Sequence, residues 1–292
     1  MKNTIIISSP AKINIGLWVK NKRPDNYHEI ATVMQTISLA DTLTLKETSE
    51  PGIKIFCDNK DVPTDSSNLI YKAAESFFKL HKLEPNLWVK LEKKIPVAAG
   101  LAGGSSNAAA TLLGLSKLYE KSVILHEIMD LASTIGSDVP FVLYGGLALA
   151  HGRGEKLFFH EPPKTPYVVV IVMPNNLKVS TKWAYDNFVH SANESKARAF
   201  DKILSAYQSG DIASLKKLVF NDLESVTLKN YPEIARIKEI LSSGNNGLVL
   251  MSGSGPAIFG LFKEKKEALM AVKGLHGLPV DVYIEHTTKK NL

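Results

Sequence analysis

Apolar and polar residues alternate along several short stretches of the N-terminal half, and this period of two predicts β-strands. The pattern is clearest over residues 13–19, where Ile13, Ile15 and Leu17 alternate with polar or small residues. Side chains two residues apart in a strand lie on one face, so Lys12 and Asn14 are expected on the same face. Short runs of apolar and β-branched residues predict further strands at 5–8, 42–46, 52–57 and 87–91.

A different spacing, with apolar residues three or four positions apart, predicts helices. One such pattern runs from Ala108 to Tyr119, and a second over residues 125–135 stops at Gly136, a residue that suits a helix C-terminus. The remaining patterns predict helices at 68–80, 183–189, 197–208, 232–241 and 263–275, strands at 167–173, 248–251, 257–262 and 280–285, and a β-hairpin with arms at 147–150 and 155–159.

The order of these elements predicts an α+β protein with two layers and mixed or antiparallel sheets. A chain of 292 residues is long enough for two domains. The best candidate for a linker is the proline-rich segment 161–166. It divides the chain into a predicted N-terminal domain, residues 1–160, and a predicted C-terminal domain, residues 161–292.

Composition excludes several classes of protein. The single cysteine, Cys57, excludes an intrachain disulfide and a cysteine-based metal cluster. The apolar stretch 139–150 contains Gly145 and Gly146 and is too short to span a bilayer. The three consecutive isoleucines near the N-terminus are too few for the core of a signal peptide. We therefore expect a cytoplasmic protein with no membrane partner.

The net charge of +6 suits an acidic ligand, either nucleotide phosphates or nucleic acid. The lysines and arginines are scattered along the chain, however, and no dense basic run is interleaved with aromatic residues. A basic, solvated surface explains this charge better than a nucleic-acid site does, so no nucleic-acid partner is expected.

The segment 96–110, with the sequence PVAAGLAGGSSNAAA, carries the strongest functional signal. Its glycines allow the backbone to approach a ligand closely, and the helix predicted to follow adds the positive end of its dipole. Together these features predict an anion site, most often for phosphate. The segment is not a P-loop, because Ser105 stands where the P-loop lysine would follow the last glycine, and its glycine spacing does not match a dinucleotide fingerprint. The alternative is a glycine-rich turn that serves only packing.

A phosphate-transferring enzyme also needs a cation and a group that deprotonates the acceptor. Lys12 and Asp138 could supply these, and residues 252–255 form a second turn of small residues. Each has a simpler explanation: Lys12 as a solvated strand residue, Asp138 as a helix N-cap and residues 252–255 as a tight turn. Tyr27 could likewise be an ordinary loop residue, and Tyr185 a core aromatic. Metalloprotease and α/β-hydrolase motifs are absent from the sequence.

Taken together, the segments 10–14, 26–29, 100–107 and 137–140 resemble the GHMP kinases, a family of small-molecule kinases, and the match covers nearly the full chain. The combination is most similar to a branch whose substrate is a cytidine diphospho-polyol. The resemblance implies a two-domain GHMP-kinase-like fold with the active site in the interdomain cleft. It also implies ATP and Mg²⁺ as cofactors, transfer of a phosphoryl group to a hydroxyl of the polyol to give the 2-phosphate, and a monomer or weak homodimer.

The resemblance also assigns roles to residues. Asp138 is implied as the general base and Lys12 as its electrostatic partner, while Ser105 or Ser106 faces Mg²⁺. The ATP side comprises Pro96, Ala98, Ala99, Gly100, Leu101, Ala102, Gly103, Gly104, Ser105, Ser106, Asn68 and Lys93. The substrate side comprises Asn14, Tyr27, His28, Thr181 and Tyr185. Ala99 and Ala102 stand where some relatives carry glycine, and Tyr185 stands where relatives carry phenylalanine.

Two other functions compete with this interpretation. A kinase of the same family with a different small-alcohol acceptor would lack a need for the cytosine-binding residues Tyr27, His28 and Tyr185. A non-catalytic nucleotide-binding regulator would not need a proton acceptor beside a lysine, so the presence of both Lys12 and Asp138 argues against it.

Overall fold

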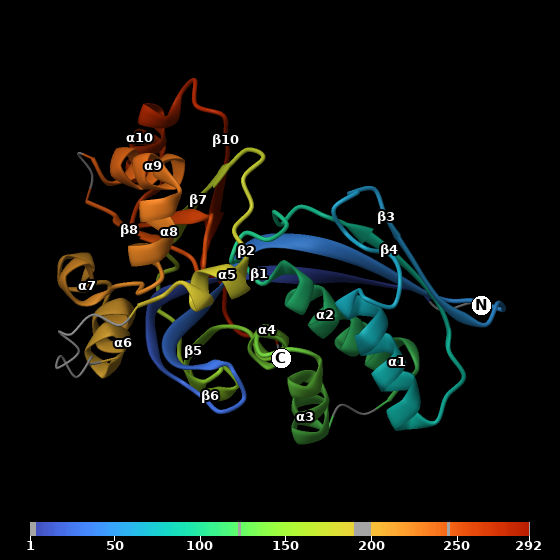
Figure 1. The fold of residues 1–292 in the computed structure, drawn as a ribbon. Helices are drawn as coiled ribbons and strands as arrows, with labels where there is room; N and C mark the ends of the chain where they lie inside the picture. Colours follow the sequence, from blue (N-terminus) through green and yellow to red (C-terminus); the bar gives the residue numbers. More distant parts are fainter. Residues whose placement is uncertain (1–3, 122–123, 190–199, 244–245, 292) are drawn as a thin grey trace.

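Two long antiparallel strands, β1 (Thr4–Lys22) and β2 (His28–Glu47), form the frame of the N-terminal part (Figure 1). The computed structural model describes residues 4–121, 124–189, 200–243 and 246–291. Strand β1 pairs along almost the whole of β2, whereas β4 pairs with the C-terminal part of β2 and β5 with its N-terminal part. The other strands of this six-stranded sheet are β3 (Gly52–Cys57), β4 (Asn86–Glu92), β5 (Leu147–Gly152) and β6 (Lys156–His160).

Helices with apolar faces cover one face of this sheet (Figure 1). Residues of these helices and of β2, β3, β4 and β5 form one buried cluster, in which Phe77, Leu112 and Phe141 are almost completely buried. Burial of such apolar side chains drives the packing of helix on sheet. The helices are α1 (Leu69–His81), α2 (Gly103–Leu118), α3 (Leu125–Ile135) and α4 (Val139–Tyr144).

The C-terminal part is built on an antiparallel four-stranded sheet in the order β10-β7-β9-β8. All residues of β7 are buried, as expected for a central strand with both faces covered. The strands are β7 (Val168–Pro174), β8 (Leu248–Met251), β9 (Ile258–Phe262) and β10 (Val280–His286). The helices are α5 (Thr181–Asp186), α6 (Phe200–Ser209), α7 (Ile212–Leu218), α8 (Glu224–Asn230), α9 (Pro232–Ser242) and α10 (Lys265–Ala271), which continues as the 3₁₀ helix Val272–Leu275.

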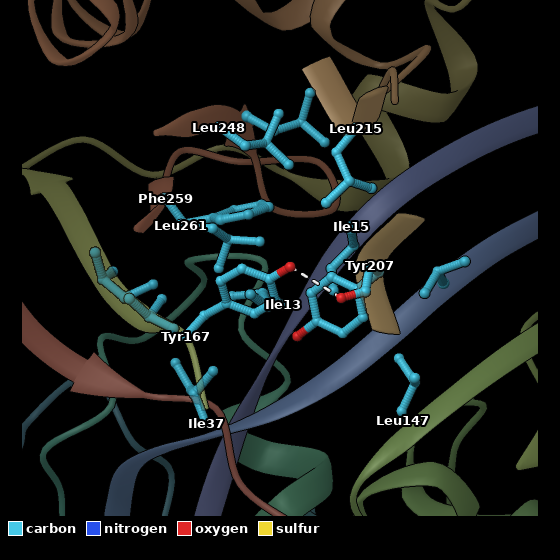
Figure 2. Close-up of a cluster of buried hydrophobic side chains, with 14 of the residues drawn as sticks. Ile13, Ile15, Ile37, Leu147, Tyr167, Tyr207, Leu215, Leu248, Phe259 and Leu261 are labelled. Carbon is cyan, nitrogen blue, oxygen red and sulfur yellow. Dashed lines mark hydrogen bonds between the residues drawn. The ribbon is translucent and has the colours of Figure 1, made fainter. Parts of the chain in front are cut away.

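One hydrophobic cluster joins the two parts (Figure 2). Ile13 and Ile37 come from β1 and β2, whereas Phe259 and Leu261 come from β9. At its centre the Tyr167 hydroxyl donates to the backbone carbonyl of Tyr207 at 2.9 Å, and the Tyr207 hydroxyl donates to Gln35 at 3.2 Å. Burial raises the pKa of Tyr167 to about 12. The two halves therefore share a core, although segment 161–166 does lie between the last strand of one sheet and the first of the other.

The predicted α+β class with mixed or antiparallel sheets is confirmed, since the first sheet contains one parallel pair, β3–β4, and the second sheet is antiparallel. The helix predicted over 125–135 has those bounds, whereas the strands predicted at 5–8 and 13–19 are parts of the single strand β1. The first half of β2 and helices α4, α7 and α8 were not predicted. Residues 197–199 of one predicted helix lie outside the described residues. Among the described helices, none combines the length and the apolar character that crossing a bilayer requires.

Candidate active site

A lysine and an aspartate from distant parts of the chain meet beside the glycine-rich segment. The ammonium of Lys12 lies 3.6 Å from the carboxylate of Asp138. It also donates hydrogen bonds to the Asn14 side chain at 2.7 Å and to the backbone carbonyl of Gly100 at 3.1 Å. Lys12 and Asn14 thus lie on one face of β1, as their spacing predicts. Lys12 is only 5% exposed, so it is not the solvated lysine of the simpler explanation.

Asp138 occupies the N-cap position of α4, but its side chain makes no capping hydrogen bond. The N-cap alternative therefore explains its backbone position and not the direction of its carboxylate, which pairs with Lys12. The carboxylate is also more accessible than its partner, since its side chain is 34% exposed against 6% for Lys12. A ligand beside these residues can therefore reach the Asp138 carboxylate, while Asn14 and the Gly100 carbonyl hold the Lys12 ammonium in place.

The glycine-rich segment leads into α2 without a side-chain cap. The N-cap residue is Ala102, whose φ of 55° lies in the left-handed region, and the first turn contains no acidic residue. The first N–H groups of a helix have no partner within the helix, so this end offers donors and a positive dipole to an anion. Ala98 and Gly100 also have positive φ, and such a conformation costs an alanine roughly 1–2 kcal/mol. Strained backbone of this kind clusters at functional sites.

The second turn of small residues, 252–255, packs against the glycine-rich segment. A Cβ on Gly100 would lie 2.1 Å from the carbonyl oxygen of Ser252, so no other residue fits there without movement of the backbone. The Ser252 hydroxyl donates to the Gly100 carbonyl at 3.0 Å, and the Ala257 N–H donates to the Ala99 carbonyl at 3.3 Å. This turn therefore packs against the glycine-rich segment and supports it, so the alternative of a tight turn with no further role does not explain these contacts.

These elements enclose a cavity of about 1080 Å³ between the two parts of the chain. All but one of the candidate site residues line this cavity. The candidates that line it are Lys12, Asn14, Tyr27, His28, Asn68, Lys93, Pro96, Ala98, Ala99, Gly100, Leu101, Ala102, Gly103, Gly104, Ser105, Asp138, Thr181 and Tyr185.

Ser106 is the exception, because it does not line the cavity, and which of the two serines faces Mg²⁺ stays a prediction. Its side chain is buried, and its hydroxyl donates to the Pro10 carbonyl at 2.7 Å and accepts from Ser9 at 2.9 Å. Ser105, the residue before it in α2, does line the cavity.

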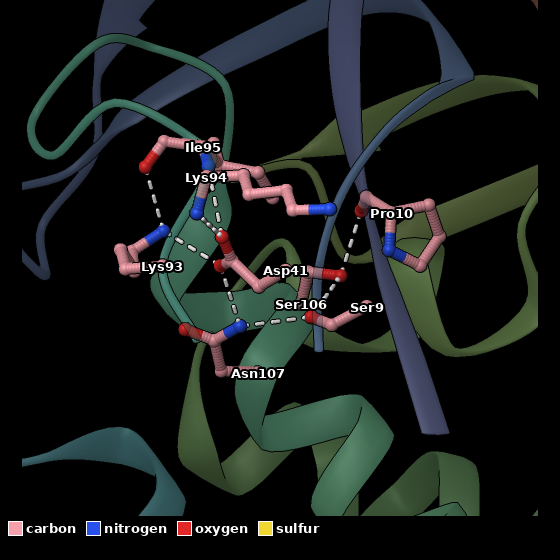
Figure 3. A network of polar contacts seen from close by, with 8 residues as sticks. All are labelled: Ser9, Pro10, Asp41, Lys93, Lys94, Ile95, Ser106 and Asn107. Carbon is pink, nitrogen blue, oxygen red and sulfur yellow. Dashed lines mark hydrogen bonds and ion pairs between the residues drawn. The ribbon is translucent and has the colours of Figure 1, made fainter. Parts of the chain in front are cut away.

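Lys93 and Asn68 line the cavity, but their polar atoms are bound within the protein. The Lys93 ammonium pairs with the buried carboxylate of Asp41 at 2.6 Å and donates to the Ile95 carbonyl at 2.8 Å (Figure 3). Burial lowers the pKa of Lys93, while the Asp41 carboxylate opposes that shift. Asn68 caps α1 by accepting from the N–H of Ile70 at 2.8 Å. A nucleotide contact by either residue stays a prediction.

Aromatic side chains gather at another part of the cavity lining. The rings of His28 and Tyr185 stack with centroids 5.4 Å apart. Tyr27 is 55% exposed, and the guanidinium of Arg153 lies 5.0 Å from its ring centroid. Burial and the nearby charge of Asp138 raise the pKa of Tyr185. Exposed ring faces beside a cation suit a planar, polar ligand.

The loop that carries Tyr27 is tied to the hairpin that carries Arg153. Arg23 pairs with Glu29 at 2.9 Å, and the other oxygen of Glu29 accepts from the Gly152 N–H at 3.1 Å. Burial would raise the pKa of Glu29, but the hydrogen bonds from Arg23 and Gly152 outweigh it and lower the pKa. The carboxylate therefore stays charged and keeps the two loops together.

Sequence reasoning missed three residues of this site. Arg153 lies in the hairpin turn between two glycines, and a cation in that setting could have been noticed. Thr32, which accepts from Asn14 at 2.9 Å, and Asp41, which holds Lys93, lie on β2 in stretches with no motif. The pairing of β2 with β1 brings Thr32 near Asn14, and the pairing of β2 with β4 brings Asp41 near Lys93. Among the described residues, no group of three or more His, Cys, Asp or Glu residues is placed to hold a metal ion.

Comparison with known proteins gives consistent matches. The profile described as "GHMP kinases N terminal domain" matches residues 68–146, and "GHMP kinases C terminal" matches residues 200–274. A protein from Geobacillus sp. (strain WCH70), named 4-diphosphocytidyl-2-C-methyl-D-erythritol kinase, is 43% identical over 279 residues, which cover 96% of this chain and 95% of that protein. A protein of the same name from Geobacillus kaustophilus (strain HTA426) is 44% identical over 278 residues, which cover 95% and 94% of the two chains.

Solved structures agree with these matches. The crystal structure of a 4-(cytidine 5'-diphospho)-2C-methyl-D-erythritol kinase superposes with a TM-score of 0.82 at 33% identity, covering 97% of this chain and 99% of that chain. A homoserine kinase from Cytophaga hutchinsonii superposes with a TM-score of 0.78 at 19% identity, covering 99% and 96% of the two chains. At that identity the second likeness is one of fold alone.

Proposed function

The chain belongs to the GHMP kinase family, and we propose that it phosphorylates 4-diphosphocytidyl-2-C-methyl-D-erythritol with ATP. The γ-phosphoryl group moves directly to a hydroxyl of the polyol and gives the 2-phosphate, a step of the non-mevalonate route to isoprenoid precursors. The observation that carries the proposal is the Lys12–Asp138 pair, 3.6 Å apart in a cavity that the uncapped start of α2 also lines.

Asp138 acts as general base and accepts the proton of the attacking hydroxyl. Its carboxylate is exposed to the cavity and is not used for capping, which supports this role. Lys12 places a positive charge beside the oxygen that becomes negative as the proton leaves. Because Asn14 and the Gly100 carbonyl already orient the ammonium, that charge needs no rearrangement during the reaction. General-base catalysis of this kind contributes about 10²–10⁴-fold.

The ATP phosphates lie against the glycine-rich segment. The free N–H groups of the first turn of α2 bind phosphate oxygens, and no acidic residue in that turn repels them. The site fits Mg²⁺ held mainly by the nucleotide, since Ser105 offers a hydroxyl to the cavity and the described residues form no acidic metal cluster. Bound Mg²⁺ would neutralise charge on the phosphates. Asn68 and Lys93 lie where the adenosine side of ATP would approach.

The substrate lies across the cavity from ATP. Tyr27, His28 and Tyr185 stack against and recognise the cytosine ring, and the stacked His28–Tyr185 pair supports this assignment. Asn14 and Thr181 contact the polyol. All these residues belong to one chain, so the site is complete in a monomer, and a weak homodimer would leave it unchanged. The cavity lies between the parts 1–160 and 161–292, which we propose as the two domains.

The direct test follows ADP formation by the purified protein with Mg-ATP and one acceptor at a time. The acceptors are 4-diphosphocytidyl-2-C-methyl-D-erythritol, homoserine, mevalonate and galactose. Turnover with the cytidyl substrate alone supports the proposal. Turnover with another alcohol would keep the phosphate site and overturn the cytosine site, and ATP binding without turnover on any acceptor would favour a regulator.

A further inference from the structure

The segment of residues 287–291, here named the strap, runs from β10 to the end of α4, the helix that carries Asp138 at its other end (Figure 1). The Asn291 N–H donates to the Tyr144 carbonyl at 2.7 Å, and its side-chain amide donates to the Val142 carbonyl at 2.9 Å. The last carbonyls of a helix have no partner within it. The strap therefore caps the C-terminus of α4.

The strap and α4 fit closely where they meet. Lys290 pairs with Gly145, the residue that ends α4. A Cβ on Gly145 would lie 2.8 Å from the side chain of Asn291, and the φ of 78° at Gly145 favours glycine in any case. The strap and the end of α4 are therefore in direct contact, with no space between them for a side chain at position 145.

The other end of the strap is tied to the strand opposite Lys12. Thr36 of β2 is the register partner of Lys12. Its hydroxyl accepts from the Thr288 hydroxyl and from the Gly146 N–H, each at 2.8 Å, and its carbonyl accepts from the Thr288 N–H at 2.9 Å. Gln35 adds a hydrogen bond to the Thr288 carbonyl at 2.7 Å. One residue of β2 thus anchors both the strap and the chain just after α4.

A closed chain of contacts results. It passes from Lys12 across the sheet to Thr36, along the strap to Asn291, through α4 to Asp138, and back to Lys12. Helix α4 has six residues and is therefore only about 9 Å long, so tilting one end shifts the other by a comparable amount. No capping hydrogen bond of its own fixes the Asp138 side chain. We infer that Asn291 is a positioning residue, which sets the placement of the Asp138 carboxylate relative to Lys12 by holding the far end of α4.

This inference rests on the proposed role of Asp138, and a double-mutant cycle tests it. Asn291→Ala removes the side-chain donor. A general base displaced by a fraction of an ångström loses rate and not substrate affinity, so kcat should fall about tenfold with both KM values within twofold of the wild type. Lys289→Ala is the matched control, because it changes an exposed side chain of the same strap and should leave kcat unchanged.

The second arm of the cycle separates positioning from general support of the fold. In an Asp138→Asn background the base is absent, so Asn291→Ala should cause no further loss of kcat. An equal fold-loss in both backgrounds, or an unchanged kcat in Asn291→Ala, would overturn the inference while leaving the kinase assignment intact. If the wild type phosphorylates nothing, the proposed function fails instead. In that case the position of Asp138 relative to Lys12 can still be tested by the ¹⁵N resonance of the Lys12 ammonium, which is assigned by its loss in Lys12→Arg. Asn291→Ala should shift this resonance, and an unshifted resonance would contradict the inference.

Discussion

Removal of the Lys93 charge should destabilise the protein strongly, because it leaves Asp41 as an unpaired buried carboxylate. Asp41 is fully buried, and the Lys93 side chain is 6% exposed. The carboxylate accepts from Lys93, from the N–H groups of Lys94 and Ile95 at 2.7 and 2.8 Å, and from Asn107 at 2.8 Å (Figure 3). It therefore joins β2 to the residues just before the glycine-rich segment and to the N-terminal half of α2.

The expected magnitude follows from the partners that remain. Breaking a buried ion pair by removing one partner costs about 3–5 kcal/mol. After Lys93→Met, Asp41 keeps three N–H donors, so the loss in the free energy of unfolding should be about 3 kcal/mol, at the lower end of that range. Asp41→Ala leaves the ammonium with the Ile95 carbonyl and releases three donors as well, so its loss should be about 5 kcal/mol, at the upper end. The double variant Asp41→Leu/Lys93→Met should recover part of the loss, because it leaves no buried charge.

The assay is urea unfolding of each variant followed by circular dichroism. Lys90→Met is the matched control: Lys90 pairs with Glu92 at 2.8 Å on the surface, where such pairs contribute at most about 1 kcal/mol. A loss below about 1 kcal/mol in Lys93→Met, comparable to the control, would refute the argument that this pair is buried and essential.

Three further predictions concern single positions. Gly100→Ala should raise the KM for ATP at least about tenfold without unfolding the protein, since its Cβ would meet the Ser252 carbonyl at 2.1 Å; an unchanged KM would contradict the tight contact. Ala102→Gly should raise the free energy of unfolding by about 0.5–1 kcal/mol, because glycine adopts the left-handed conformation of this position without strain. Thermal unfolding measures this gain, and an unchanged stability would show that Ala102 is not strained. The folded-state pKa of Tyr167, about 12, lies above its unfolded value of 10.0, so the stability it contributes is present below pH 10 and is lost as the pH rises to 12. In urea unfolding, the free energy of unfolding of Tyr167→Phe should fall less steeply between pH 10 and 12 than that of the wild type. An equally steep fall in both proteins would exclude ionisation of Tyr167 as the cause.

Local patterns sufficed for much of the fold and of the site. The alternation around Lys12 and Asn14 predicts their common face, and the glycine-rich segment predicts that a helix follows, although α2 begins at Gly103 and not at the predicted Ala108. Helix α4 was missed because it is short and buried on all sides, so its sequence has no polar face to create a period. The first half of β2 was missed for the same reason, since it is buried from Ile30 to Ile37 and does not alternate.

Long-range pairing determines what the sequence could not supply. Ser105 and Ser106 are equivalent in the sequence, and only the packing of α2 against β1 buries Ser106 beneath Pro10. Lys93 resembles a free cation until β2 brings Asp41 against it. In each case a contact between residues more than fifty positions apart decides the role, and local periodicity contains no information about such contacts.

The proposed phosphoryl transfer is best tested by ³¹P NMR of the reaction between the protein, Mg-ATP and 4-diphosphocytidyl-2-C-methyl-D-erythritol, run in parallel with Asp138→Asn. The wild type should produce a new phosphomonoester signal in step with ADP while the signals of the substrate diphosphate persist. The variant should fold normally and form that product at least about 100-fold more slowly. Release of inorganic phosphate without the phosphomonoester would exclude transfer to the polyol, and near-normal product formation by Asp138→Asn would exclude Asp138 as the general base.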